Sequence, residues 1–383
     1  MKILFHYHTP AIQKGSGIYM PAYLGLFIDS IAKYYEEIIL LLHLPNKKQK
    51  EITKYKLKSN NIKLVSLSVH SNIPHRYLLA PFFINKLFKL RNNVDNLLLR
   101  ASTPYLPFVY LFWKKNTTLL FVSDANKGLD ELNQNYLKLN LIKVWAHICN
   151  KFELSFAKKS NVIVNSYTLL EKFKKINKEV KLISTTTIEE KEIFYRKDTC
   201  LSSPYKLLFS GRISRNKGIF DLIGALYILR QKGFEVNLNI VGFFENDRLK
   251  DELKSTISKL NLNSFISIKG FFNAGPQLLK WYRNSDIFVM PTRSEGEGFP
   301  RVIWEAMASS LPVLATDLPG IKEKVNDSIK TFQKCSPEEI AKAITFVIEN
   351  KKYRQELIIK GVNSVKEITL EKQAKIISKI IQS

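Results

Sequence analysis

The stretch DIFVMPTRSEGEGFPRVIWEAMASSLPVLAT, residues 286–316, contains the repeating unit of the fold. An apolar run, DIFVMPT, leads into a glycine-rich turn, a segment of helical period from Pro300 to Ser309, and a second apolar run, PVLAT. Proline is well tolerated at the first position of a helix, so we expect the helix to begin at Pro300. This order predicts a strand, a crossover helix and a parallel strand.

The same alternation continues through nearly the whole chain, which indicates an α/β protein with parallel sheets. Strands are predicted at residues 2–7, 37–43, 62–68, 96–102, 117–123, 161–166, 180–185, 205–211, 236–242, 265–270, 286–292 and 312–316. The clearest helices are predicted at residues 136–159, 218–233 and 300–309. A chain of 383 residues is too long for one core.

We therefore expect two Rossmann-like, doubly wound domains that face each other across a cleft. The first is predicted at 1–190 and the second at 205–365. Residues 191–204 are polar and lie just before Pro204, as expected of a linker. A final helix, 366–383, is expected to pack back toward the first domain.

Composition excludes several classes of protein. Three widely spaced cysteines indicate neither a disulfide framework nor a zinc site. His6, His8 and Pro10 interrupt the apolar start of the chain, which favours a first strand over a signal peptide. The longest apolar stretch, 97–113, contains Arg100 and two prolines and is too short to span a membrane. A cytoplasmic location fits these features.

The net charge of +25 leans toward the start of the chain, where residues 1–115 carry 17 Lys and Arg against 5 Asp and Glu. Such a field attracts phosphorylated substrates, anionic membranes or nucleic acids. A lysine-rich codon bias is an equally good explanation. Because the sequence lacks a zinc finger, an RNA-binding aromatic motif or a compact helix-turn-helix, nucleic acid is the least favoured partner.

Ligands of doubly wound sheets bind at the carboxyl ends of strands, and three loops at such positions are candidate binding loops. In GRISRNKG, residues 211–218, Arg212 and Lys217 precede a helix and suit a diphosphate, although a basic surface loop would look the same. In the first domain, Gly15, Ser16 and Gly17 are expected where a strand gives way to a helix. They form either a binding loop or a flexible turn.

The third loop contains Glu297, and Glu305 is expected about a turn and a half into the helix that follows the Gly298–Phe299–Pro300 corner. A carboxylate near a helix start can accept hydrogen bonds from vicinal hydroxyls, as on ribose or a hexose. Two carboxylates with open helix amides between them would suit a sugar at each end of a diphosphate. Equally, Glu297 could be a turn residue and Glu305 a helix former on a solvated face.

The motifs GRISRNKG, IVG, DIFVMPT and EGFPRVIWEAMASSLPVLATDLPG, in this order, resemble the family 4 retaining glycosyltransferases of the GT-B fold. The resemblance is specific over residues 205–325 and rests on architecture before that. It implies that Arg212 and Lys217 bind the donor diphosphate and act in catalysis together with Glu297. The resemblance also implies that Glu305 holds the ribose hydroxyls.

For the transferred sugar, the resemblance implies a site at Glu297 and the amides of Gly298 and Phe299. The Gly15–Ser16–Gly17 loop would close over the phosphates, and the base would lie near residues 269–273. Phe243 and Phe244 follow Gly242, whereas the family often has another glycine two positions after IVG. The family's histidine in the first domain has no match near Asp124.

The implied activity is transfer of a hexose-type sugar from a nucleotide-diphosphate sugar to a glycan or lipid-linked acceptor in cell-surface polysaccharide or lipopolysaccharide synthesis. Because cations and amides would stabilise the leaving diphosphate, no metal and no cofactor are expected. A nucleotide-sugar epimerase or a phosphorylase on the same scaffold is the alternative. Residues 76–93 mix basic and aromatic side chains, which predicts peripheral docking on an anionic membrane or a helix packed on its own sheet.

Overall fold

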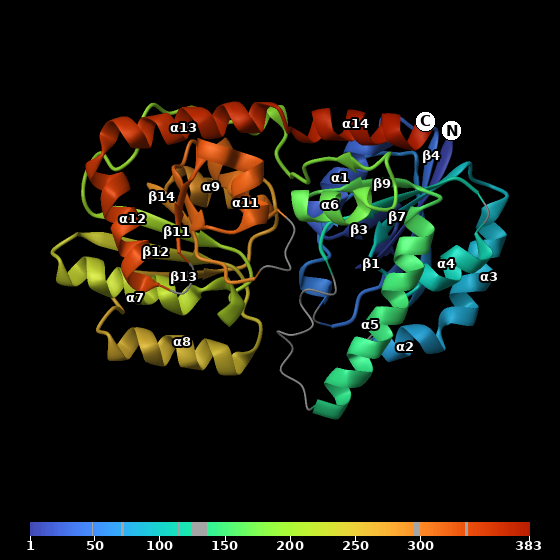
Figure 1. Ribbon diagram of the computed structural model, residues 1–383, viewed down its shortest axis with the longest axis horizontal. Coiled ribbons are helices and arrows are strands. Elements are labelled where there is room, and N and C mark those ends of the chain that lie inside the picture. Colours follow the sequence, from blue (N-terminus) through green and yellow to red (C-terminus); the bar gives the residue numbers. More distant parts are fainter. Residues whose placement is uncertain (48, 70–72, 114, 125–135, 295–298, 334–335) are drawn as a thin grey trace. The chain divides into compact units, whose positions relative to one another are not determined.

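The chain folds into two compact units. The computed structural model describes residues 1–47, 49–69, 73–113, 115–124, 136–294, 299–333 and 336–383. Unit 1 is built mainly from Met1–Thr185 and Leu370–Ser383, and unit 2 mainly from Thr186–Glu295 and Pro300–Thr369. Each unit contains one large parallel sheet with helices on both faces, as Figure 1 shows for each.

Unit 1 is centred on a seven-stranded sheet in the order β10-β9-β8-β7-β1-β4-β6, in which every paired strand is parallel. Its strands are β1 Lys2–Pro10, β4 Glu37–Leu44, β6 Ile62–Val69, β7 Asn96–Ala101, β8 Thr117–Phe121, β9 Asn161–Val164 and β10 Lys181–Leu182. A small antiparallel sheet adds β2 Ile12–Lys14, β3 Gly17–Met20 and β5 Tyr55–Lys56.

The helices of unit 1 divide between the two faces of this sheet. They are α1 Ala22–Ala32, α2 Ile73–Leu78, α3 Ala80–Arg91, α4 Leu106–Phe112, α5 Tyr136–Ala157, α6 Tyr167–Lys174 and α14 Leu370–Gln382, with a 3-10 turn η1 at Gln49–Glu51. Helices α1 and α14 cover one face and lie side by side in Figure 1, whereas α3 to α6 pack on the other.

Strand sequences explain this arrangement. Successive side chains point to opposite faces, so Leu4 enters one core while Ile3 and Phe5 enter the other. Because both faces are buried, strands such as EIILLLHL at Glu37–Leu44 read as continuous apolar runs rather than as alternating ones.

Unit 2 contains a six-stranded parallel sheet in the order β13-β12-β11-β14-β15-β16. Its strands are β11 Tyr205–Ser210, β12 Val236–Val241, β13 Ile266–Gly270, β14 Ile287–Met290, β15 Val313–Thr316 and β16 Lys330–Phe332. Its helices are α7 Ile219–Gln231, α8 Asp247–Lys259, α9 Pro276–Arg283, α10 Arg301–Ala308, α11 Pro319–Val325, α12 Pro337–Glu349 and α13 Lys351–Lys366, with 3-10 turns η2 Glu190–Glu192, η3 Arg215–Lys217 and η4 Asn326–Ser328.

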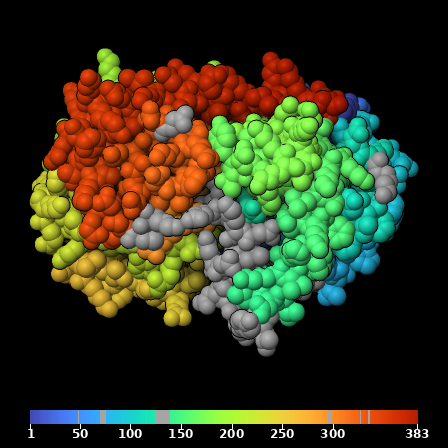
Figure 2. Space-filling model, in the orientation of Figure 1, coloured from blue at the N-terminus to red at the C-terminus, as the bar shows by residue number. Residues whose placement is uncertain are grey.

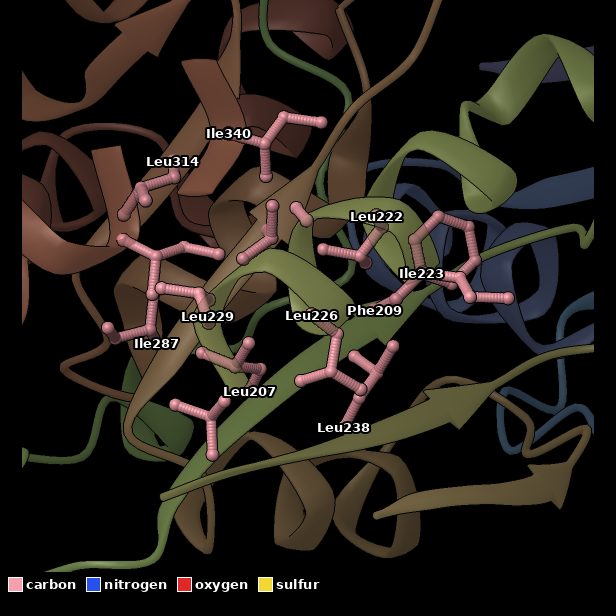
Figure 3. Packing of buried hydrophobic residues seen from close by; sticks show 14 of the residues in the cluster. Leu207, Phe209, Leu222, Ile223, Leu226, Leu229, Leu238, Ile287, Leu314 and Ile340 are labelled. Atoms are coloured by element: carbon pink, nitrogen blue, oxygen red, sulfur yellow. The ribbon is translucent and has the colours of Figure 1, made fainter. Parts of the chain in front are cut away.

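The core of unit 2 lies between the sheet and helices α7, α8, α12 and α13. Leu207 and Phe209 of β11 meet Leu222 and Leu226 of α7 there, and Figure 3 shows these side chains converging. Local signals fix the helix ends: Asn246 caps α8 by accepting a hydrogen bond from Leu249 N at 2.8 Å. Because the strands are parallel, their carboxyl ends lie along one edge of the sheet.

The polar segment 191–204 lies within unit 2 in the structure, and the boundary between the units falls at Thr185 and Thr186 rather than near residue 190. Its side chains are held by specific bonds: the Arg196 guanidinium donates to the carbonyls of Ser310 at 3.2 Å and Ser285 at 2.7 Å. Buried Asp198 forms an ion pair with Arg354 at 2.8 Å. Arg196 and Asp198 pack within unit 2 because each has a hydrogen-bond or ion-pair partner there.

The final helix, α14, belongs to unit 1. Ala374, Ile377 and Ile381 fill the core beneath α1. Asn96 Nδ2 donates to the carbonyl of Ile381 at 2.6 Å, which fixes the end of the helix against the first residue of β7. The chain therefore returns to the sheet on which it began, and Figure 1 shows the N- and C-termini close together.

Candidate functional site

The loop after β11 contains the two cations that the sequence singles out. Arg212 follows Gly211, and its guanidinium lies 3.7 Å from the Glu245 carboxylate with half of its side chain exposed. Lys217 ends the 3-10 turn η3, and Gly218 then begins α7 with a left-handed φ of +67°. Both cations therefore lie between the end of a central strand and the amino terminus of a helix, where anions bind favourably.

This loop is fixed to the loop after β14. A Cβ atom added at Gly218 would lie 1.9 Å from the carbonyl oxygen of Pro291, so only glycine fits. Arg293 N donates to the carbonyl of Asn216 at 2.7 Å. The Arg293 guanidinium also binds both oxygens of Asp221, at 2.9 and 2.5 Å, in the first turn of α7.

A second close approach joins the loops after β11 and β12. A Cβ atom added at Gly242 would lie 1.8 Å from the carbonyl oxygen of Gly211. Ile213 N donates to the Phe243 carbonyl at 2.9 Å, and Glu245 N donates back to the Ile213 carbonyl at 3.0 Å. Three neighbouring strands thus end in one connected set of loops.

Glu305 lies on α10 and is buried, with only 6% of its surface exposed. One carboxylate oxygen accepts a hydrogen bond from the Thr187 hydroxyl and the other accepts one from the Tyr282 hydroxyl, both at 2.9 Å. The interpretation of Glu305 as a helix former on a solvated face is therefore wrong. Each carboxylate oxygen retains capacity for a further donor.

Tyr282 connects this carboxylate to the loop after β11. Its hydroxyl also hydrogen-bonds to Ser210, the last residue of β11. Burial, and then the Glu305 carboxylate, raise the pKa of Tyr282 well above its usual value, so the hydroxyl remains a donor. The chain Glu305–Tyr282–Ser210 places the buried carboxylate one side chain away from the strand end that precedes Arg212.

The sequence did not indicate the partners of these residues. Thr187 and Tyr282 are separated from Glu305 by 118 and 23 positions, so no local pattern relates them. Asp221 and Arg293 are 72 positions apart. The acidic residue in the first turn of α7 is the only signal that could have pointed to Asp221.

Of the other predicted site residues, Glu297 and Gly298 lie outside the described residues. Phe299 directly precedes Pro300. Pro300 is the N-cap of α10, with an extended ψ of 118°, rather than its first helical residue.

The structure corrects the local setting of Gly15, Ser16 and Gly17. They lie at the turn of the β2–β3 hairpin, where Lys14 pairs with Gly17, and α1 begins only at Ala22. Gly15 has a φ of +56°, which suits a two-residue hairpin turn. The expected junction of strand and helix is therefore wrong, and a role of this loop toward the donor stays a prediction.

Two aromatic side chains follow the neighbouring strands. Phe243, after β12, is 47% exposed and Phe271, after β13, is 42% exposed. Their rings meet edge to face, with centroids 5.7 Å apart. The bulky residue expected after IVG therefore forms part of an exposed aromatic pair beside the loop that contains Arg212.

Asp124 and residues 76–93 also have defined surroundings. Lys172 Nζ lies 3.2 Å from Asp124, so this carboxylate is engaged in an ion pair. Residues 76–93 form two helices that break at Leu79, and Phe83 and Leu87 enter the core of unit 1. In the part of the chain that the structure describes, no helix is long and apolar enough to cross a membrane.

Comparison with known protein families finds a match in the second half of the chain. The family model described as glycosyl transferases group 1 matches residues 190–363. Residues 190–363 belong to this family. The match contains the loops after β11, β12 and β14 and all of α10, so the elements described above lie within the matched segment.

Curated relatives agree over part of their length. A D-inositol 3-phosphate glycosyltransferase of Arthrobacter sp. (strain FB24) is 36% identical over 124 residues, which are 32% of this chain and 29% of the relative. The capsular polysaccharide biosynthesis glycosyltransferase CapM of Staphylococcus aureus is 29% identical over 185 residues, 48% of this chain and 46% of CapM. Each match therefore spans less than half of the relative.

Solved glycosyltransferases share the whole fold. Anabaena HepE, in complex with UDP and glucose, has 18% identity and a TM-score of 0.73, covering 100% of this chain and 99% of HepE. WaaG, a glycosyltransferase involved in lipopolysaccharide biosynthesis, has 13% identity and a TM-score of 0.69, covering 100% of both chains. The chain has the GT-B fold of two Rossmann-like units, as the sequence predicts.

Proposed function

We propose that this protein is a retaining glycosyltransferase that moves a hexose-type sugar from a nucleotide-diphosphate sugar to a glycan or lipid-linked acceptor in cell-surface polysaccharide synthesis. The observation that carries the proposal is the buried Glu305 carboxylate, linked through Tyr282 to the loop that holds Arg212 and Lys217. Family membership of residues 190–363 supports it, as do the relatives of polysaccharide synthesis.

In this proposal the donor diphosphate binds at the loop 211–218. Negative charge grows on the leaving diphosphate while the sugar–oxygen bond breaks. Arg212 supplies a fork of donors, Lys217 a point charge and the start of α7 backbone amides, and close backbone approaches at Gly218 and Gly242 hold the main chain of the loop in place before reaction. Preorganised donors of this kind stabilise a developing charge without a metal ion or a cofactor.

Glu305 would hold the ribose hydroxyls of the nucleotide. A carboxylate already held by Thr187 and Tyr282 keeps one orientation, and its remaining acceptor sites can take the two hydroxyl protons of a diol. By the family resemblance, Glu297 and the amides of Gly298 and Phe299 would address the transferred sugar.

Phe243 and Phe271 would lie near the nucleobase. The resemblance places the base near residues 269–273, and Phe271 belongs to that segment. HepE was solved with UDP, so UDP-sugars are the first donors to test.

An acceptor carried by a lipid would bring the enzyme to a membrane surface. On α2 and α3, Leu78, Phe82 and Phe88 are 78%, 42% and 47% exposed, and Lys86 Nζ lies 5.3 Å from the Phe82 ring. Figure 2 shows α5, in green, on the surface of the same unit. Exposed aromatic rings beside lysines suit the headgroup region of an anionic leaflet.

The test is a panel of sugar nucleotides assayed in EDTA with the wild type, Arg212→Ala and Glu305→Ala. Arg215→Ala is the matched control, because Arg215 is an arginine of the same loop to which the proposal gives no role, and its guanidinium binds Glu252 on α8. The proposal expects one donor to bind, both site variants to weaken it, the control to leave it unchanged, and the product to keep the anomeric configuration. Binding that is indifferent to both site variants, or epimerisation of the donor without an acceptor, would contradict it.

A further inference from the structure

The carboxyl edge of the sheet of unit 1 gathers basic side chains to which the proposed donor site gives no role. His6 and His8 lie on β1, which pairs with β7 on one side and β4 on the other. Arg100 lies near the end of β7 and Arg76 on α2. His6 is fixed by short contacts, with Nδ1 2.7 Å from the carbonyl oxygen of Leu41.

Three of these side chains each contain a buried nitrogen that lacks a hydrogen-bond partner among the described residues. Among the described residues, His8 Nδ1, Arg76 Nε and Arg100 Nε are buried without a hydrogen-bond partner. The Arg100 guanidinium carbon lies 4.5 Å from the centroid of the Tyr7 ring, and the Tyr7 and His8 rings are 4.2 Å apart. Burying such nitrogens without a partner is costly, so a binding site is the better explanation for their retention.

The electrostatics of the cluster agree with this geometry. Burial, followed by Arg76 and Arg100, lowers the pKa of His8 to about 3. Burial also lowers the pKa of Arg76. In the described part of the chain, no carboxylate is among the groups that shift the pKa of His8 or Arg76. The three basic side chains (Arg76, Arg100 and His8, hereafter the edge cluster) therefore place two guanidinium groups beside a neutral imidazole.

We propose that the edge cluster binds a phosphate group carried by the acceptor, so that unit 1 selects phosphorylated acceptors. This inference rests on the proposed function, because it names the class of acceptor. Two guanidinium groups and an imidazole, presented by three different elements, offer more donors than the two oxygens of a carboxylate need, and they suit a phosphate. An anion here would satisfy the buried nitrogens and offset the positive charge that Arg76 and Arg100 place beside His8.

Histidine NMR provides a test that does not depend on sugar transfer. All six histidines lie in residues 1–147, within unit 1, so their ring resonances report on that unit. The full chain is labelled with 15N-histidine, His8 is assigned with His8→Gln, and inorganic phosphate is titrated at constant ionic strength. A bound anion favours the protonated ring, so the ring 15N resonances of His8 should move and saturate.

Variants test whether the edge cluster binds the phosphate. Arg100→Gln should raise the dissociation constant of phosphate by about tenfold or more, because a charged hydrogen bond is lost. Arg76→Gln should do the same and serves if Arg100→Gln fails to fold, as judged by its melting temperature. Lys58→Gln, which removes an exposed cation 6.0 Å from the Tyr55 ring, is the control and should change nothing.

Acceptor assays then distinguish the two sources of phosphate. A soluble sugar phosphate and a short-chain polyprenyl diphosphate sugar are compared as acceptors, and the one whose KM rises in Arg100→Gln carries the phosphate. A His8 signal that ignores phosphate, or equal phosphate affinity in Arg100→Gln and the wild type, would overturn the inference even if transfer occurs. Conversely, phosphate binding at His8 without transfer from any sugar nucleotide would support the edge cluster and refute the proposed function.

Discussion

Replacing Gly218 by alanine should damage the donor site through one backbone contact. Gly218 has a φ of +67°, and an alanine there costs about 1–2 kcal/mol for the left-handed conformation alone. Its Cβ would also lie 1.9 Å from the carbonyl oxygen of Pro291, a backbone atom that cannot rotate away. Overpacking of this kind adds about 1–3 kcal/mol.

Gly233→Ala separates these two costs. Gly233 lies at the other end of α7, also has a left-handed φ, of +82°, and has nothing within 4 Å of its added Cβ. Both variants incur the cost of placing an alanine in the left-handed conformation. The difference in stability between them therefore isolates the contact with Pro291. With roughly 2–4 °C per kcal/mol for a unit of this size, Gly218→Ala should melt roughly 2–12 °C below Gly233→Ala.

Donor binding provides the second assay. Relieving the overlap requires the loop 211–218 to move away from the loop after β14, which displaces Arg212 and Lys217, and misplacement by about 1 Å can cost a hundredfold. Isothermal titration should therefore find donor affinity reduced by about tenfold to a hundredfold in Gly218→Ala and unchanged in Gly233→Ala. Equal melting temperatures, or equal donor affinities, would refute the reasoning.

Three further predictions concern buried polar groups. Tyr282→Phe removes a hydrogen bond to the Glu305 carboxylate worth about 1.5–3 kcal/mol, so calorimetry should find nucleotide affinity reduced by about tenfold, with unchanged affinity as the contrary result. Asp198→Ala leaves Arg354 buried without its ion-pair partner and should lower the free energy of unfolding in urea by about 3–5 kcal/mol; a loss below about 1 kcal/mol would contradict this. Burial lowers the pKa of His6 from 6.5 to about 4, so between these values the unfolded chain binds a proton that the folded chain does not. The contribution of His6 to the stability of unit 1 should therefore be full above pH 6.5 and fall by about 3 kcal/mol toward pH 4, and a His6→Phe variant that keeps the same slope would contradict the assignment.

The parallel sheets could be predicted because burial on both faces leaves a strong trace in the sequence. Strands such as Glu37–Leu44 are almost wholly apolar, and each predicted strand is present with boundaries shifted by a few residues. Strand β16, Lys330–Phe332, was missed because three residues at a sheet edge carry no such run. The sequence does not predict the β2–β3 hairpin, because Gly15 fits equally well in a loop that leads into a helix.

Polar residues were harder to interpret because their partners are distant in sequence. Arg196 and Asp198 made the segment 191–204 look like a linker, although hydrogen bonds and an ion pair hold both within unit 2. Arg212 and Glu305 were found from their motifs. The contacts that orient Glu305 depend on tertiary packing, and no local spacing of residues encodes them.

The most direct test of the central claim is whether Glu305 binds the ribose hydroxyls of the donor. The binding of a nucleoside diphosphate and of its 2′,3′-dideoxy analogue should be measured by calorimetry for the wild type and for Glu305→Gln. The account predicts that losing the diol weakens binding to the wild type, that Glu305→Gln weakens binding of the ribose form, and that combining both changes adds little more. If the two losses are simply additive, Glu305 does not contact the diol, and the buried carboxylate serves only to hold Thr187 and Tyr282 in place.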